Sequence, residues 1–170
     1  METLTIRQPA SEADHAAIRQ LCRAYRELLA ERATSLPEIV ESYYGKASYE
    51  KLLARLPKTH ARPRGAMFLA HLGDTPVGCG MTRRIDSETS EIKRVFVAPE
   101  ARGHGAATAI FEAAMDQARA DGYSRMVLDT MVWLTEAIAL YGKLGFAPCP
   151  PFYKPDPRFT GHILYFSRPL

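Results

Sequence analysis

Cysteine is scarce in this sequence, histidine is dispersed, and no long apolar run is present. The 170 residues include three cysteines, widely spaced and never arranged as Cys-x-x-Cys, which disfavours a disulfide framework and a zinc knuckle. The five histidines show no metal-ligand spacing, so we expect no metal site. No apolar run approaches the roughly 20 residues that span a bilayer, so we expect no membrane association.

Neither sign of charge dominates, and the N-terminal segment carries no targeting pattern. The chain has 22 Lys and Arg against 19 Asp and Glu, and a net charge of +3 is too small to indicate nucleic-acid binding by itself. The first seven residues, METLTIR, lack the apolar core of a secretion signal. Length and a hydrophobic content of 46% fit one globular domain. We therefore expect a single domain over residues 1–170, cytoplasmic, and a monomer or homodimer.

The hydrophobic pattern predicts an α/β protein whose first half is antiparallel. Strands are expected at residues 3–7, 66–71, 77–83, 91–97, 126–129, 146–147 and 163–166. Helices are expected from Ser11 to about residue 32, in a short piece from 37 to 44, and at 48–56, 103–120 and 134–144. The stretch from 57 to 65, with two prolines, is expected to be a loop.

A Gly-rich segment at the start of one predicted helix is the most informative part of the sequence. It reads Arg102-Gly103-His104-Gly105-Ala106-Ala107 and follows a strand that ends before Pro99. Glycines at a helix N-terminus let backbone N–H groups approach an anion, and the helix dipole favours phosphate there. Arg102 adds a charged donor. The segment therefore indicates a diphosphate site.

Two nucleotide-binding patterns compete for the same segment. A P-loop needs Lys and Ser or Thr after its last glycine, and no Lys follows Gly105. A dinucleotide fingerprint needs glycine or alanine where Thr108 stands. Asp129 lies about where such a fold places a ribose-binding acid, but the preceding strands are predicted to be linked as hairpins. A nucleotide-binding oxidoreductase is therefore an alternative that a binding comparison has to exclude.

Two ordered motifs resemble the GNAT superfamily of N-acetyltransferases. Arg102-x-x-Gly105-x-Ala107 matches the signature Q/R-x-x-G-x-G/A, which in that family grips the diphosphate of acetyl-CoA. Residues 95–100 resemble the strand and turn that precede it, and residues 137–146 resemble the later segment A-x-x-L-Y-x-K-x-G-F. The predicted order of elements also fits. The resemblance implies a single-domain GNAT fold, with a mixed, mostly antiparallel central sheet and helices on both faces.

Three further segments resemble a group of bacterial putative acetyltransferases. They are a Glu-x-Lys-Arg strand, a Leu-Asp-Thr strand end and a Pro-Pro-aromatic-Tyr loop, found here at residues 91–94, 128–130 and 150–153. This resemblance does not fix the acceptor molecule.

The family resemblance implies where acetyl-CoA, the expected co-substrate, would bind. The backbone groups of Val95 and Val97 would pair with the pantetheine arm, and the Val95 N–H would face the thioester oxygen. The diphosphate would lie against the N–H groups of residues 102–107, namely Arg102, Gly103, His104, Gly105, Ala106 and Ala107. Many family members carry Asn where Leu134 stands here, so one pantetheine contact is lost or supplied by Thr135 or Glu136.

The same resemblance implies two catalytic residues, Glu91 as general base and Tyr141 as general acid. Glu91 lies four residues before Val95, and strand alternation puts the two on one face with Lys93, provided that the bend of the strand lies beyond Val95. A Glu paired with a nearby Lys or Arg and a Tyr that merely packs in the core are the alternatives. We expect contacts to the acceptor from Lys93, Arg94, Asp129 and Tyr153.

The resulting hypothesis is an acetyl-CoA-dependent N-acetyltransferase that acetylates a primary amine by direct attack on the thioester. A small molecule or amino acid is favoured over a protein as the acceptor. The alternative from another class is a catalytically silent acyl-CoA-binding or sensor module of the same fold. The residues expected to bound the acceptor cleft lie in two segments, about 34–65 and 148–158.

Overall fold

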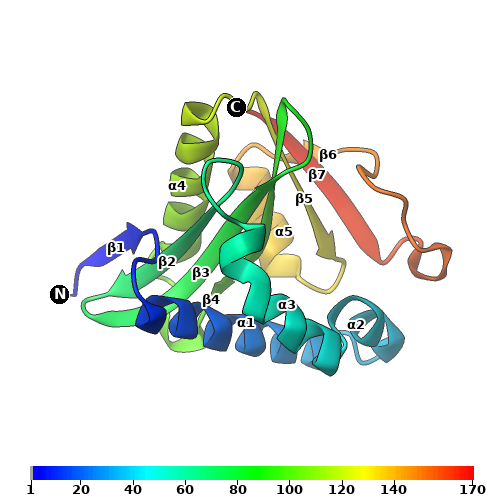
Figure 1. The fold of residues 1–170 in the computed structure, drawn as a ribbon. Helices are drawn as coiled ribbons and strands as arrows, with labels where there is room; N and C mark the ends of the chain where they lie inside the picture. Colours follow the sequence, from blue (N-terminus) through cyan, green and yellow to red (C-terminus); the bar gives the residue numbers. More distant parts are fainter. Residues whose placement is uncertain (1) are drawn as a thin grey trace.

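The computed structural model describes residues 2–170, which form one seven-stranded mixed sheet with helices on both faces (Figure 1). The strand order is β1-β2-β3-β4-β5-β7-β6. Strand bounds are β1 Leu4–Arg7, β2 Ala66–Leu72, β3 Thr75–Arg84, β4 Thr89–Val97, β5 Arg125–Met131, β6 Ala147–Pro148 and β7 Ile163–Pro169. Every neighbouring pair is antiparallel except β4 with β5. The predicted fold class is confirmed.

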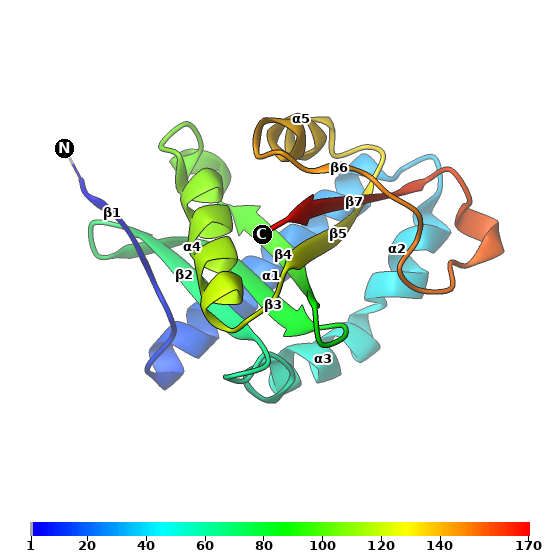
Figure 2. The ribbon, with the colours of Figure 1, turned by 90° about the horizontal axis from the view of Figure 1, so that it is seen from above.

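Five helices surround the sheet. They are α1 Glu12–Arg32, α2 Pro37–Tyr44, α3 Lys46–Thr59, α4 Ala106–Ala120 and α5 Thr135–Lys143, with a 3₁₀ turn at Pro99–Ala101. The hydrophobic clusters divide these helices between two faces, with α1 and α3 packed on one face and α4 and α5 on the other. Figure 2, which views the molecule from above, shows α4 and α5 across the sheet from α1. No helix within residues 2–170 is long and apolar enough to cross a membrane.

Local sequence signals explain where α1 begins. The Ser11 hydroxyl accepts a hydrogen bond from the Asp14 N–H (3.1 Å), and the Asp14 carboxylate accepts one from the Ser11 N–H (3.2 Å). This reciprocal capping box satisfies two N–H groups that the first turn leaves without helical partners. The buried positions of α1 recur at three- and four-residue spacing, so that one stripe of the helix covers the sheet.

The helix α3 is longer than the sequence predicts. Pro57 was expected to begin a loop, but it lies inside the last turn of α3, which continues to Thr59. A proline inside a helix removes one backbone donor, and the last turn of α3 forms in spite of this loss. The end of the helix keeps a backbone bond, since the N–H of the C-cap residue His60 donates to the Leu56 carbonyl (2.9 Å). The expected loop therefore begins after Thr59.

The strands β4 and β5 pair only at their beginnings and then separate. Their parallel register covers Thr89–Glu91 of β4 and Arg125–Val127 of β5. Beyond it, β4 continues to pair with β3 on its other side and β5 with β7. Backbone groups along the second half of β4 therefore have no strand beside them on the β5 side. A wedge-shaped opening in the sheet results, between residues 92–97 and 128–131.

A β-bulge bends β4 at Arg94. Across the β3 pairing, Met81 lies opposite Lys93 and Cys79 opposite Phe96, so Gly80 faces two residues of β4 instead of one. Arg94 has φ of +52°, a left-handed backbone conformation that is uncommon for a residue with a side chain. The extra residue reverses the alternation, so the Val95 side chain packs on the α4 face with Ile92. The expectation that Glu91, Lys93 and Val95 share one face is therefore wrong, because the bulge comes before Val95.

Candidate active site

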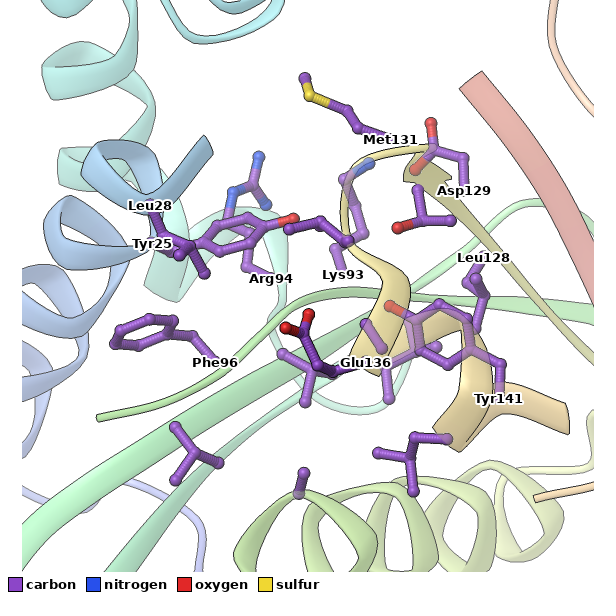
Figure 3. Close-up of a pocket in the computed structure, with 18 of the residues that line it drawn as sticks. Tyr25, Leu28, Lys93, Arg94, Phe96, Leu128, Asp129, Met131, Glu136 and Tyr141 are labelled. Atoms are coloured by element: carbon purple, nitrogen blue, oxygen red, sulfur yellow. The ribbon is translucent and has the colours of Figure 1, made fainter. Parts of the chain in front are cut away.

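A cavity occupies the opening between β4 and β5 (Figure 3). One end is lined by Val97, Arg102 and Ala107, beside the N-terminus of α4. The other end is lined by residues of α1, α2, the outer part of β5 and the start of β7, among them Tyr25, Leu28, Tyr43, Tyr44, Met131 and Ile163. Lys93, Arg94 and Asp129 lie between, and Leu134, Glu136 and Tyr141 close the side formed by α5. The cavity therefore joins the predicted diphosphate loop to three of the four predicted acceptor residues, Lys93, Arg94 and Asp129, whereas Tyr153 is not among the lining residues.

The loop before α4 presents backbone donors to one end of this cavity. Gly103 and Gly105 have φ of +84° and +79°, and a β-carbon at either position would meet nothing within 4 Å. The chain enters the helix through the left-handed Gly105, which makes no side-chain cap. The N–H groups of the first turn consequently have no helical acceptors. The site fits a diphosphate, because these donors, the helix dipole and a nearby guanidinium converge there.

Of the residues predicted to bind the diphosphate, the structure brings two side chains to the cavity, those of Arg102 and Ala107. Arg102 Nε donates to the Val97 carbonyl oxygen at 3.4 Å, which links the loop to the end of β4. The His104 ring lies elsewhere, with Nδ1 3.2 Å from the Ala101 carbonyl oxygen. The geometry therefore gives His104 a contact within its own loop, and its predicted role in cofactor binding stays a prediction.

Tyr141 reaches the middle of the cavity from α5. Its ring packs edge-on against Phe111, with Phe146 and Phe166 also adjacent, and the residue is 9% exposed. Figure 3 shows the hydroxyl directed into the cavity. Burial raises the pKa of Tyr141 to about 12, and the charge of Asp129 acts in the same direction. Tyr141 thus combines core packing with a protonated hydroxyl that faces the cavity, and its predicted role as general acid stays a prediction.

Glu91 lies in a buried ion-pair cluster and is absent from the cavity lining. Its two carboxylate oxygens accept from Arg83 Nε (2.7 Å) and from Lys93 Nζ (2.9 Å). Burial alone would raise the pKa of Glu91, but the positive charges of Lys93 and Arg83 outweigh it and hold the pKa below its ordinary value. Lys93 does line the cavity, so Glu91 fixes the position of a cavity residue.

Arg94 enters the cavity from the bulge and has few partners. Its Nε is buried without a hydrogen-bond partner in residues 2–170, and Nη1 lies 3.8 Å from the Met81 sulfur. Asp129 enters from β5, and one of its oxygens, Oδ2, accepts a hydrogen bond from the Tyr153 hydroxyl (2.6 Å). Burial and the Asp129 carboxylate raise the pKa of Tyr153 strongly, so its hydroxyl stays a donor. Tyr153 thus orients Asp129 from the late loop.

Several cavity residues have no distinct signal in the sequence. Tyr25 and Leu28 belong to the apolar stripe of α1, which predicts packing, and Arg32 is indistinguishable from an ordinary basic residue at a helix end. Arg32 forms an ion pair with Glu136, which also lines the cavity (3.1 Å). Of the first segment expected to bound the acceptor cleft, only residues of α2 reach the cavity lining within the described chain.

A family model matches most of this chain. The model described as "Acetyltransferase (GNAT) family" matches residues 23–146. The matched range begins within α1 and ends after α5, so it includes the loop before α4 and every residue that lines the cavity except Ile163.

Relatives and solved structures agree with that match. An IAA acetyltransferase of Azospirillum brasilense is 41% identical over 117 residues, which are 66% of this chain and 73% of the relative. The uncharacterized N-acetyltransferase YjgM of Escherichia coli is 34% identical over 55% of this chain and 58% of its own length. An acetyltransferase structure from Streptococcus agalactiae superposes with a TM-score of 0.78, 20% identity and full coverage of both chains. The PaiA N-acetyltransferase of Thermoplasma acidophilum, solved in complex with coenzyme A, has a TM-score of 0.74 at 19% identity and 99% coverage of both chains.

Proposed function

Since the chain belongs to the Acetyltransferase (GNAT) family and is an acyltransferase, we propose that it transfers the acetyl group of acetyl-CoA to a primary amine of a small molecule. The observation that carries the proposal is the cavity between the separated strands β4 and β5. It connects the N–H groups of the loop before α4 to the Tyr141 hydroxyl and to a chamber lined by Arg94 and Asp129. Relatives and structural neighbours that are named as acetyltransferases or hold coenzyme A support the choice of donor.

The residues divide between holding acetyl-CoA and receiving the amine. The first-turn N–H groups of α4 and the Arg102 guanidinium would hold the diphosphate. The second half of β4, which has no strand beside it, would pair with the pantetheine arm through the backbone of Val95 and Val97. The Val95 N–H would donate to the carbonyl oxygen as negative charge develops there. Glu136 lines the cavity beside Leu134 and is the polar group available near the position of the missing Asn.

When bound, acetyl-CoA supplies an activated acyl group: the amine nitrogen bonds the carbonyl carbon as the carbon–sulfur bond breaks, and the electron pair leaves on sulfur. Tyr141 then donates its phenolic proton to that sulfur. A pKa of about 12 lies about 3.5 units above that of an ordinary thiol, an uphill transfer of about 5 kcal/mol. Burial in the same site also disfavours the thiolate, which raises the pKa of the thiol and reduces the difference between the two pKa values.

The amine must lose a proton to complete the balance, and an ordinary alkylamine is neutral in only about one molecule in 2,500 at pH 7. Glu91 is the proton acceptor predicted by its position on the strand. Because both of its oxygens are bonded to cations and Glu91 itself does not line the cavity, the proton can reach it only through Lys93 or an intervening water. We therefore propose that Glu91 acts as general base indirectly, by accepting the amine proton through one of these intermediates.

A binding comparison and a turnover assay test the proposal. Acetyl-CoA should raise the melting temperature of the purified protein, and NAD or NADP should not, because ligands stabilise a fold in proportion to their binding. A thiol-trapping assay with a broad amine panel should then detect release of coenzyme A that depends on the amine. Stabilisation without turnover of any amine would favour the alternative, a silent acyl-CoA-binding module. Preferential stabilisation by NAD or NADP would overturn both.

A further inference from the structure

The acceptor side of the cavity contains two oppositely charged groups that no ion pair within residues 2–170 neutralises. The other charged lining residues have assignments: Arg32 pairs with Glu136 at 3.1 Å, and Lys93 pairs with Glu91 at 2.9 Å. Arg102 lies at the opposite end, beside the N-terminus of α4. Arg94 and Asp129 are the charged lining residues without an ion-pair partner in the described chain, and both face the chamber that would receive the amine.

Arg94 has the properties of an anion-binding residue without its anion. Its buried Nε lacks a partner in the described chain, and a thioether sulfur 3.8 Å from Nη1 is a weak acceptor. Burying a charged donor without an acceptor is unfavourable, and so is the left-handed backbone that carries it. A planar guanidinium pairs best with a two-oxygen anion such as a carboxylate, through two parallel hydrogen bonds.

Neighbouring side chains limit the anion at Arg94 to a modest charge. Tyr44 packs edge-on against Tyr25 in the same chamber, with ring centroids 6.0 Å apart. Burial raises the pKa of Tyr44 to about 12, so its hydroxyl stays protonated. One guanidinium with neutral hydroxyl donors beside it balances a single negative charge, which a carboxylate carries.

Asp129 has the properties of an ammonium-binding residue. Tyr153 occupies Oδ2, while Oδ1 makes no hydrogen bond to any of residues 2–170. That oxygen belongs to a half-buried residue on the cavity wall, where a charge is screened less than on an open surface. A primary ammonium group supplies the donors that Oδ1 lacks.

We propose that the acceptor is an amino carboxylate, whose carboxylate binds the Arg94 guanidinium and whose amino group binds Asp129. Leu28, Met131 and Ile163 form an apolar wall for the remainder of the molecule. The proposal rests on the proposed acetyltransferase function and specifies the class of its substrate. Lys93 is the other cation beside this chamber, but the charge of Glu91 already neutralises it at 2.9 Å, so Arg94 is the stronger candidate for the carboxylate contact.

Matched acceptors test the requirement for the carboxylate. Each of the common amino acids is compared with its amide, and phenylalanine and leucine also with phenethylamine and isoamylamine, at saturating acetyl-CoA. For the best acceptors, kcat/KM should be about 10- to 100-fold higher for the acid than for the amide, the usual worth of a charge-assisted hydrogen-bond pair. Equal or better turnover of the amides or simple amines would overturn the inference and leave the proposed function standing. Thiol release only with amines of the broad panel that carry no carboxylate would overturn the inference in the same way, whereas absence of thiol release from every compound of both panels would contradict the proposed function itself.

Two variants assign the contacts. Arg94→Gln should raise KM for the amino acid about 10- to 100-fold while leaving KM for its amide and for acetyl-CoA within twofold. Asp129→Asn should raise KM for acid and amide alike, because both carry the amine. Arg55→Gln, at an exposed position of α3, is the matched control and should change neither constant.

A folding defect is separated from a binding defect by the melting temperature of each variant and by Arg94→Lys. This variant keeps the charge but lacks the fork, and it should recover only part of the affinity. An Arg94→Gln protein that folds and discriminates acid from amide as the wild type does would overturn the assignment of Arg94. If Arg94→Gln does not fold, wild-type discrimination by Arg94→Lys would overturn it equally.

Discussion

Lys93 donates to Glu91 over 2.9 Å between side chains two residues apart on β4, and Arg83 occupies the other oxygen of the same carboxylate. Arg83 is directly opposite Glu91 in the antiparallel register, so the three side chains lie on one face of the sheet. Glu91 is 0% exposed, whereas Lys93 lines the cavity. The pair therefore ties a buried carboxylate to the site, and the charge of Glu91 can be tested in two separate ways.

Glu91→Gln tests its role in proton transfer. The amide keeps the size of the side chain but cannot accept a proton, so we expect kcat to fall by about 100-fold, the lower range for general-base catalysis. Arg83→Gln is the control, because it removes one of the two ion pairs of Glu91 and leaves the carboxylate. Steady-state kinetics from pH 5 to 9 would show the loss with Glu91→Gln alone. Equal kcat for the two variants would limit Glu91 to positioning Lys93.

The same variant tests the contribution of Glu91 to stability at different pH values. The folded-state pKa of Glu91 lies below its ordinary value of 4.5, so its stabilising effect is full above 4.5 and is lost as the pH falls through the lower folded value. Glu91→Gln should lower the free energy of unfolding by about 2 kcal/mol at pH 7, since it leaves two cations with a neutral partner. The deficit should shrink on acidification. Urea unfolding of wild type and variant at pH 7 and at a pH below 4.5 measures this difference in the free energy of unfolding. A difference that stays constant between the two would contradict the lowered pKa.

Tyr141→Phe tests proton donation to the leaving sulfur. The ring contacts with Phe111 and Phe166 are retained, so we expect an unchanged melting temperature, KM values within about twofold, and a loss of about 100-fold or more in kcat. Steady-state kinetics at saturating acetyl-CoA would establish the effect. A variant that turns over at the wild-type rate would remove Tyr141 from the chemistry and leave it a packing residue.

The pH profile of the wild type provides a separate check on Tyr141. Its pKa is raised to about 12, so the hydroxyl keeps its proton through the alkaline range in which a free tyrosine, with a pKa near 10, would lose it. We therefore expect kcat to show no decline up to about pH 10.5 that is attributable to Tyr141. A decline with a midpoint near 10 that disappears in Tyr141→Phe would show that the residue titrates normally.

Gly80 tests whether close packing at the bulge matters. A β-carbon added there would lie 2.6 Å from Ile110 Cγ2 of α4, so Gly80→Ala should destabilise the fold by about 1–3 kcal/mol. Gly142→Ala is the matched control: it lies in α5, its new β-carbon meets nothing within 4 Å, and it should stabilise the helix by about 0.5–1 kcal/mol. Chemical denaturation measures the change in the free energy of unfolding of each variant, which should fall for Gly80→Ala and rise for Gly142→Ala. A neutral Gly80→Ala would contradict the close approach of α4 to the bulge.

The sequence predicts most of the fold because its signals are local. Alternation identifies the strands, the capping box at Ser11 marks the start of α1, and the glycines before Ala106 mark the start of α4. The exceptions come from tertiary structure. Pro57 remains helical because packing of α3 decides the end of that helix, and the bulge at Arg94 depends on the pairing of β3 with β4, which no local pattern specifies.

The candidate site is predicted where a motif lies in one continuous segment and is not predicted where distant segments meet. Arg102 and Tyr141 belong to motifs, and the structure brings both to one cavity. Tyr25 has no such signal, because a tyrosine on an apolar helical stripe is indistinguishable from a core residue. Two other features can be seen only in the three-dimensional structure. One is the hydrogen bond between Tyr153 and Asp129, and the other is that Lys93 has an ion-pair partner whereas Arg94 has none within the described chain.

A crystal structure of the acetyl-CoA complex tests the central claim most directly. The diphosphate should lie against the first-turn N–H groups of α4 and the Arg102 guanidinium. The thioester should lie in the opening between β4 and β5, with its oxygen at the Val95 N–H and its sulfur within hydrogen-bond distance of the Tyr141 hydroxyl. A bound acetyl-CoA whose thioester lies outside this opening, or away from Tyr141, would contradict the account.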